Sequence, residues 1–140
     1  MRVVAICAAA VLGLAVAGCG GGEDKDKEAA GKPCGPAPAA MAGKPTLPPK
    51  FPTPSEVTYT GSKNEGPTTV VSGYWGDGDL TAAHHGYSSA FTSAGYTVTH
   101  EEQDAADSEV NFTGSGKSGQ VKLSQRCKDR IMLTVTIRPA

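Results

Sequence analysis

An apolar run near the start of the chain constrains the fold more than any other feature. It extends from Val3 to Ala17, follows the basic residue Arg2, and leads into Gly18, Cys19 and three further glycines. A positive start, an apolar middle and small residues at the exit are typical of a secretory signal, which is not part of the mature fold. We therefore expect residues 1–18 to be a signal peptide. The run holds about 15 residues, fewer than the ~20 of a membrane-spanning helix.

The end of this run carries a specific motif. The residues Val16-Ala17-Gly18-Cys19 resemble the lipobox of bacterial lipoproteins, a family in which the signal is cut just before the cysteine. The resemblance implies that the mature chain begins at Cys19 and carries fatty acyl chains such as palmitate there. Two or more buried acyl chains give stable attachment to a membrane, so the implied location is the extracytoplasmic face of the cell membrane. An ordinary cleaved signal peptide that contains a cysteine is the alternative.

The four cysteines of the chain can be assigned on the basis of this resemblance. Cys7 would leave with the signal and Cys19 would be acylated, which leaves Cys34 and Cys127. Two thiols in an oxidising compartment favour a disulfide, and we expect one between these residues. Two free thiols, or pairing between molecules, are the alternatives. The absence of a C-x-x-C motif argues against thioredoxin-like redox chemistry.

The charge of the chain argues against a nucleic-acid partner. The formal net charge is −1, and Arg2 is the only charged residue of the expected signal, so the remainder carries −2. A nucleic-acid-binding domain needs a basic patch or stripe. The abundance of glycine, proline and alanine indicates a GC-rich genome. With the motif at Cys19, the layout resembles that of small actinobacterial lipoproteins.

Residues 19–54 have the composition of a lipidated, disordered tether. Three glycines are followed by alternating charges from Glu23 to Glu28, and later by a proline-rich run from Lys44 to Pro54. Short polar segments bury too little surface to order themselves. Proline lacks the N–H that helices and central strands need, so we expect the proline-rich run to be extended. A stiff spacer along the domain is the preferred interpretation, and a docking peptide for a proline-binding domain is the alternative.

Residues 55–140 predict a small α+β domain, in which one helix packs on an antiparallel sheet of five or six strands. Asp79 is a good N-cap, and Gly95 suits the left-handed position that follows a helix. Alternation of apolar and polar residues, with short turns between the segments, predicts strands joined as hairpins. The expected order is β-β-α-β-β-β-β, with these elements: strands 57–60 and 68–75, a helix over 80–94, and strands 96–100, 108–113, 119–125 and 131–137.

Two adjacent aromatic residues, Tyr74 and Trp75, are the candidate ligand-binding or partner-binding residues. Side chains alternate between the two faces of a strand, so we expect one of this pair to be exposed. An exposed aromatic patch around them would favour a protein or peptide partner. Simple packing in the core is the alternative for both residues.

No residue of the sequence is assigned as catalytic or metal-binding, and no cofactor is expected. His84 and His85 are adjacent, and neighbours on a helix point about 100° apart rather than toward one metal. His100 could approach one of them. The acidic segment 101–109 could hold a calcium ion, because oxygen-rich loops suit that ion, although a solvated hairpin tip is the default. Ser88, Ser89 and Ser93 are more simply surface residues than members of a catalytic triad.

The sequence therefore predicts a lipid-anchored protein of the cell envelope that binds an envelope partner or a small ligand and is not an enzyme. Two alternatives remain. One is a small envelope hydrolase or metal-dependent enzyme that uses His84, His85 or His100 with the acidic segment. The other is an extracellular inhibitor or sensor domain.

Overall fold

The computed structural model describes residues 31–140, so the expected signal peptide and Cys19 lie outside the described residues. Over this range the chain forms six strands and one helix, which confirms the α+β class and the predicted order of elements. The elements are β1 (Val57–Glu65), β2 (Thr68–Trp75), α2 (Leu80–Ser93), β3 (Thr97–Gln103), β4 (Asp107–Gly114), β5 (Lys117–Cys127) and β6 (Arg130–Pro139).

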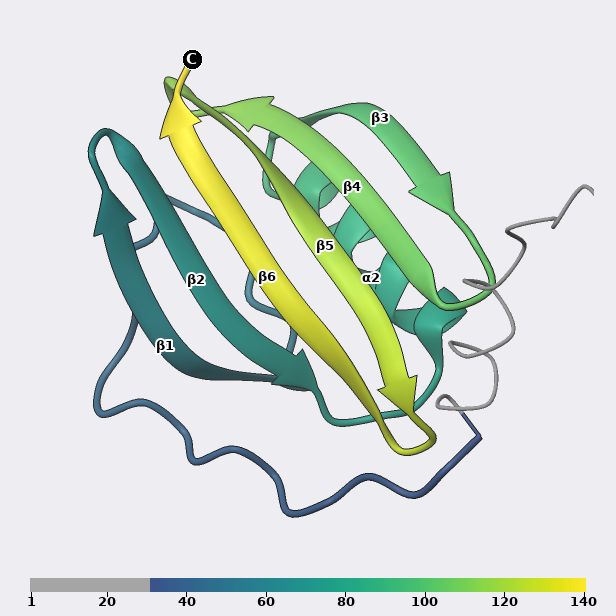
Figure 1. Cartoon of the computed structure of the whole chain (residues 1–140). Helices are drawn as coiled ribbons and strands as arrows, with labels where there is room; N and C mark the ends of the chain where they lie inside the picture. Colours follow the sequence, from purple (N-terminus) through teal and green to yellow (C-terminus); the bar gives the residue numbers. More distant parts are fainter. Residues whose placement is uncertain (1–30) are drawn as a thin grey trace, which may run out of the picture.

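All six strands belong to one antiparallel sheet with the order β1-β2-β6-β5-β4-β3. After the β1–β2 hairpin, the chain enters α2, which crosses one face of the sheet to the far edge (Figure 1). It then returns strand by strand from β3 to β6. The last strand is inserted between β2 and β5, so the two halves of the sheet are joined through β6 (Figure 1).

The helix begins and ends where the sequence predicts. The side chain of Asp79 accepts a hydrogen bond from the backbone N–H of Ala82 at 2.9 Å, which satisfies one of the free donors of the first turn. Gly95 follows the helix with φ +83°, a conformation that L side chains rarely adopt. One side of the helix is buried against the sheet, namely Leu80, Ala83, His84, Tyr87 and Phe91.

The core lies between α2 and the covered face of the sheet. Alternate residues of β6 form its longest row, Ile131, Leu133, Val135 and Ile137, and all are buried. Four aromatic rings pack together near the C-terminal end of α2. Phe91 stacks on Phe112 with centroids 4.4 Å apart, and Phe51 and Tyr96 contact both rings edge-on. Such aromatic pairs contribute about 0.5–1.5 kcal/mol each beyond the area that they bury.

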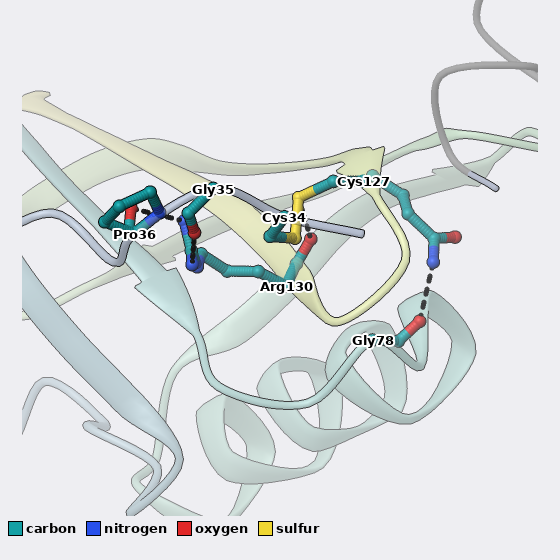
Figure 2. The surroundings of a disulfide bond; sticks show 7 residues. Cys34, Gly35, Pro36, Gly78, Cys127 and Arg130 are labelled. Carbon is teal, nitrogen blue, oxygen red and sulfur yellow. Dashed lines mark hydrogen bonds between the residues drawn. A yellow bond between two sulfur atoms is a disulfide. The ribbon is translucent and has the colours of Figure 1, made fainter. Parts of the chain in front are cut away.

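The described part of the expected tether, residues 31–54, packs along the folded domain. Cys34 and Cys127 form a disulfide with Cα atoms 5.0 Å apart, which confirms the predicted pairing. Beside it, the Arg130 guanidinium donates to the carbonyl oxygens of Gly35 and Pro36 at 2.8 and 3.4 Å (Figure 2). Further along, Phe51 enters the core. The folded unit therefore includes this segment, to which we refer below as the strap.

Candidate functional site

The two candidate aromatic residues lie on opposite faces of the sheet. Trp75 points toward α2, is 5% exposed, and packs against Tyr87 with ring centroids 6.1 Å apart. Tyr74 lies on the face that α2 does not cover, and the Arg130 guanidinium sits 5.4 Å from its ring centroid. A guanidinium over an aromatic face is an attractive contact. The pair therefore forms no joint aromatic patch, and Tyr74 is the member available to a ligand.

A polar cluster joins the helix to the sheet near the far edge, in which His84 and Ser108 are buried and Glu101 is exposed. The Nδ1 atom of His84 is 2.5 Å from the Ser108 hydroxyl, and its Nε2 atom is 3.4 Å from a carboxylate oxygen of Glu101. Serine, histidine and glutamate are the residue types of a hydrolase triad. Ser108, however, is only 1% exposed, and a nucleophile must reach its substrate. The cluster fits a polar bridge between α2, β3 and β4 better than a catalytic centre.

Sequence reasoning placed Glu101 in the acidic segment that could act with the histidines, but it missed Ser108 as a partner of His84. It considered Ser88, Ser89 and Ser93 instead, because they lie on the helix. The alternation of β4 could have revealed Ser108, because this residue lies on the same face of the strand as the core residues Val110 and Phe112. A buried serine in that row needs a hydrogen-bond partner from the layer above it.

The three histidines do not converge on one site. His85 is exposed and its ring lies edge-on to that of His84, with centroids 5.5 Å apart. His100 lies on the open face of β3, where its Nε2 atom is 3.8 Å from Glu102. Within residues 31–140, no group of three or more His, Cys, Asp or Glu side chains is arranged to hold a metal ion.

The acidic segment belongs mostly to strands. Glu101 and Glu102 lie on β3, Asp107 and Glu109 lie on β4, and only a short turn near Asp104 separates them. Glu102 stands directly opposite Glu109 in the register, an arrangement of like charges that is unfavourable unless cations lie nearby. The Lys122 ammonium of β5 lies near Glu109 and provides such a cation.

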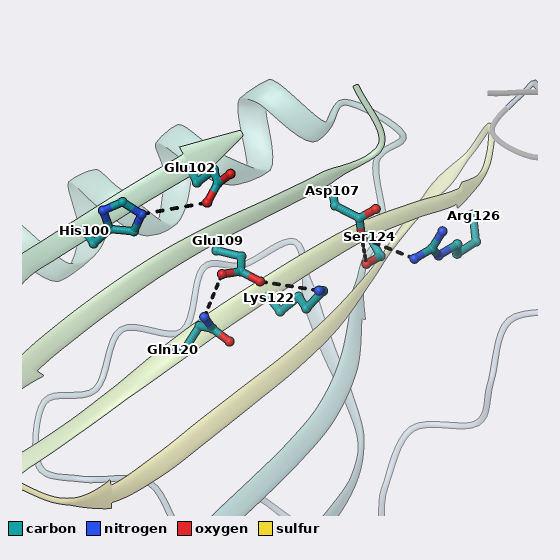
Figure 3. A network of polar contacts seen from close by, with 8 residues as sticks. All are labelled: His100, Glu102, Asp107, Glu109, Gln120, Lys122, Ser124 and Arg126. Atoms are coloured by element: carbon teal, nitrogen blue, oxygen red, sulfur yellow. Dashed lines mark hydrogen bonds and ion pairs between the residues drawn. The ribbon is translucent and has the colours of Figure 1, made fainter. Parts of the chain in front are cut away.

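The open face of the sheet carries a network of polar contacts over β4 and β5 (Figure 3). Glu109 accepts a hydrogen bond from the Gln120 amide at 2.8 Å and lies 3.4 Å from the Lys122 ammonium. Asp107 accepts from the Ser124 hydroxyl and lies 3.3 Å from the Arg126 guanidinium. These strands present charged and hydrogen-bonding groups to solvent, so recognition on this face would be polar.

Next to this network lies a hollow of about 200 Å³, lined by Asn111, Gly119, Gln120, Thr136 and Arg138. Asn111, Gln120 and Thr136 are consecutive members of one cross-strand row, which runs over β4, β5 and β6. Arg138 follows Thr136 by two residues on β6 and therefore shares its face. We call these four side chains the Arg138 hollow. Amide, hydroxyl and guanidinium groups converge there.

A second hollow lies on the helix side of the molecule. It is an open groove of about 700 Å³ between the strap and α2, with Pro52 and Pro54 on one side, Gly86 and Ala90 on the other, and Trp75 among the lining residues. Its lining is mainly apolar, with Thr53, Glu56 and Ser93 as its polar side chains.

Two tyrosine hydroxyl groups are buried in the core. The Tyr59 and Tyr87 hydroxyls lie near each other, and that of Tyr59 also lies near Thr53, but within residues 31–140 none of these contacts has the geometry of a hydrogen bond. Burial raises the pKa of both phenols. For Tyr59 the nearby hydroxyls of Thr53 and Tyr87 oppose part of this rise, whereas for Tyr87 the neighbouring Tyr59 phenol adds to it. Both groups remain neutral at physiological pH and add no charge to the core.

No helix within the described range is long and apolar enough to cross a membrane. No protein-family model, curated protein or solved structure matches this chain. The open face and the Arg138 hollow are therefore identified from the geometry of this chain alone.

Proposed function

We propose that this protein is an exported lipoprotein, held on the extracytoplasmic face of the cell membrane by acyl chains on Cys19, whose α+β domain binds an envelope partner or a small ligand without catalysing a reaction. The observation that carries the proposal is the motif Val16-Ala17-Gly18-Cys19 at the end of the apolar run. A signal of this form provides both export and a lipid-modified cysteine.

The disulfide supports the export part of the proposal. Disulfides such as Cys34–Cys127 form and persist in oxidising compartments and are rare in the bacterial cytoplasm. The bond also limits the length of chain between the proposed anchor at Cys19 and the folded domain, because it attaches Cys34 to the sheet. Cys34 follows Cys19 by 15 positions, so the domain would stay within roughly 50 Å of the membrane surface even with this stretch fully extended.

The burial of Ser108 favours binding over hydrolysis. A small hydrolase would need the Ser108–His84–Glu101 cluster to open toward solvent, yet Ser108 is buried beneath α2. The open face of the sheet offers a more direct way to recognise a partner, because its polar side chains already stand in solvent. An inhibitor or sensor would use the same face, with the half-buried Tyr74 as its aromatic residue.

The anchoring is tested by expressing the full chain in an actinobacterial host that is fed an alkyne analogue of palmitate. The expected result is a labelled protein in the membrane fraction, with residues 19–140 as its polypeptide. Cys19→Ala should abolish the label, whereas the matched variant Cys34→Ala should retain it. A soluble, unlabelled wild-type protein, or a label that survives Cys19→Ala, would contradict the proposal.

A further inference from the structure

The Arg138 hollow has hydrogen-bonding capacity that the described chain does not use. Within residues 31–140, the Arg138 guanidinium has no carboxylate within ion-pairing distance, and the side chains of Asn111 and Thr136 have no hydrogen-bond partner. The Gln120 amide nitrogen donates to Glu109, which leaves the Gln120 side-chain oxygen available as an acceptor. Asn111, Gln120 and Thr136 are half-buried and Arg138 is exposed, so a ligand could reach all four.

The types of these groups specify the chemistry of a ligand. A guanidinium presents a planar fork of donors that matches a carboxylate with two parallel hydrogen bonds. Carboxamide and hydroxyl groups can each donate and accept, as the hydroxyls of a sugar also do. The side chains that line the hollow are polar, so it has no recess for an apolar side chain of a peptide.

The charge distribution on the open face sets the orientation of such a ligand. Arg138 stands opposite Ser118 on β5, near one end of the sheet, whereas Asp107 stands opposite Ser124 near the other end. Glu109 lies between them and already has Lys122 and Gln120 as partners. Asp107 and Glu109 are each paired with a cation of β5, so the guanidinium of Arg138, which has no such partner within residues 31–140, is the group that attracts a carboxylate.

We propose that the Arg138 hollow binds one acidic sugar residue of a polysaccharide, with the sugar carboxylate on Arg138 and its hydroxyls on Asn111, Gln120 and Thr136. The neighbouring rows of the same face add the hydroxyls of Ser118 and Thr134, which extend the polar surface beyond one sugar ring. The proposal deepens the proposed function, since it relies on export to bring the domain to envelope polysaccharides. Its test needs only purified protein and is independent of the anchor.

The test is a titration of the purified full chain, labelled with ¹⁵N, with tetragalacturonate and with its methyl ester, which has the same sugar chain but no charge. Tetragalacturonate should shift the side-chain amide signals of Asn111 and Gln120, and the ester should not. Arg138→Gln should weaken the binding about tenfold, a typical loss when one charge-assisted pair is removed. Arg138→Lys should recover only part of the affinity, because it keeps the charge but loses the fork.

Lys128→Gln is the matched control. Lys128 is exposed in the turn between β5 and β6, at the opposite end of these strands from Arg138. Its substitution changes the net charge by the same amount as Arg138→Gln, so this variant should bind like the wild type. Equal binding of the methyl ester would overturn the role of the carboxylate. Equal binding of acetate or of the dipeptide alanyl-alanine would overturn the role of the sugar and leave a general carboxylate site. Absence of binding, or loss of binding in Lys128→Gln as well, would overturn the proposal.

Discussion

Gly86 lies directly against the indole ring of Trp75, so closely that a Cβ atom at residue 86 would be 2.7 Å from the Cη2 atom of the ring. Glycine in the middle of a helix costs up to about 1 kcal/mol relative to alanine. The close approach of α2 to the sheet explains the presence of this residue, because a methyl group would occupy the space of the buried indole. The helix can therefore pack this closely on the covered face of the sheet only because residue 86 has no side chain.

Gly86→Ala is expected to destabilise the domain by about 1–3 kcal/mol, the usual cost of forcing extra atoms into a packed core. Trp75 is the only tryptophan of the chain, so its fluorescence during guanidinium unfolding provides the measurement. Gly61→Ala is the control, because a Cβ there would meet nothing within 4 Å. If Gly86→Ala instead raised the unfolding midpoint, helix propensity would outweigh the contact with Trp75.

Removal of the disulfide by the double variant Cys34→Ala/Cys127→Ala should lower the free energy of unfolding by about 4–5 kcal/mol in the chain-entropy model. The reason is the length of the closed loop, since the two cysteines are 93 residues apart in sequence. Thermal unfolding with and without reductant gives the measurement. Reductant should destabilise the wild type but not the double variant, and equal melting temperatures for all four samples would contradict the prediction.

Stability should fall steeply at alkaline pH because of Tyr59 and Tyr87. Burial raises the pKa of both phenols above the ordinary value of 10.0, so above about pH 10 the unfolded chain loses protons that the folded chain retains. The contribution of these two groups to the free energy of unfolding is then constant below that pH and decreases above it, with a limiting slope of about 1.4 kcal/mol per pH unit for Tyr87 and a loss in the same direction for the less buried Tyr59. Tyr87→Phe should reduce this slope, and Tyr59→Phe/Tyr87→Phe should reduce it further. Urea unfolding between pH 8 and 11 measures it, and an unchanged slope in the double variant would refute the prediction.

Ser108→Ala should destabilise the domain by about 1–3 kcal/mol, because the buried Nδ1 atom of His84 would lose the hydroxyl that lies 2.5 Å away. Ser89→Ala, on the exposed side of α2, should change the stability by less than about 0.5 kcal/mol. Urea unfolding curves of the two variants at pH 8 provide the comparison. Equal stabilities would show that the cluster of His84, Ser108 and Glu101 does not hold the helix to the sheet.

Local patterns in the sequence were sufficient to predict the elements and their order. The alternation of Ile131, Leu133, Val135 and Ile137 identified β6, and Asp79 with Gly95 marked the limits of α2. The expected strand 57–60 was too short, since β1 continues to Glu65. Its second half lies at the edge of the sheet and is mainly exposed, so both of its faces are polar there and no alternation reveals it.

The candidate binding site could not be predicted from local patterns. The residues of the Arg138 hollow come from β4, β5 and β6, and they meet only because the register of three strands aligns them. Alternation shows that Thr136 and Arg138 point away from the core, but it does not identify their neighbours. Likewise, the strap has no ladder of hydrogen bonds that a sequence pattern could signal. Its attachment depends on single contacts such as Phe51 in the core and the carbonyl oxygens of Gly35 and Pro36.

The disulfide at the start of the strap also determines how a mechanical load would enter the domain. Any pull on the chain before Cys34 passes through the covalent bond to Cys127, at the hairpin between β5 and β6. These are the two central strands of the sheet. The load therefore bypasses the strap and the edge strand β1, which a pull on a reduced chain would peel away first. An intact disulfide makes the middle of the sheet the point of attachment, and reduction would move that point to its edge.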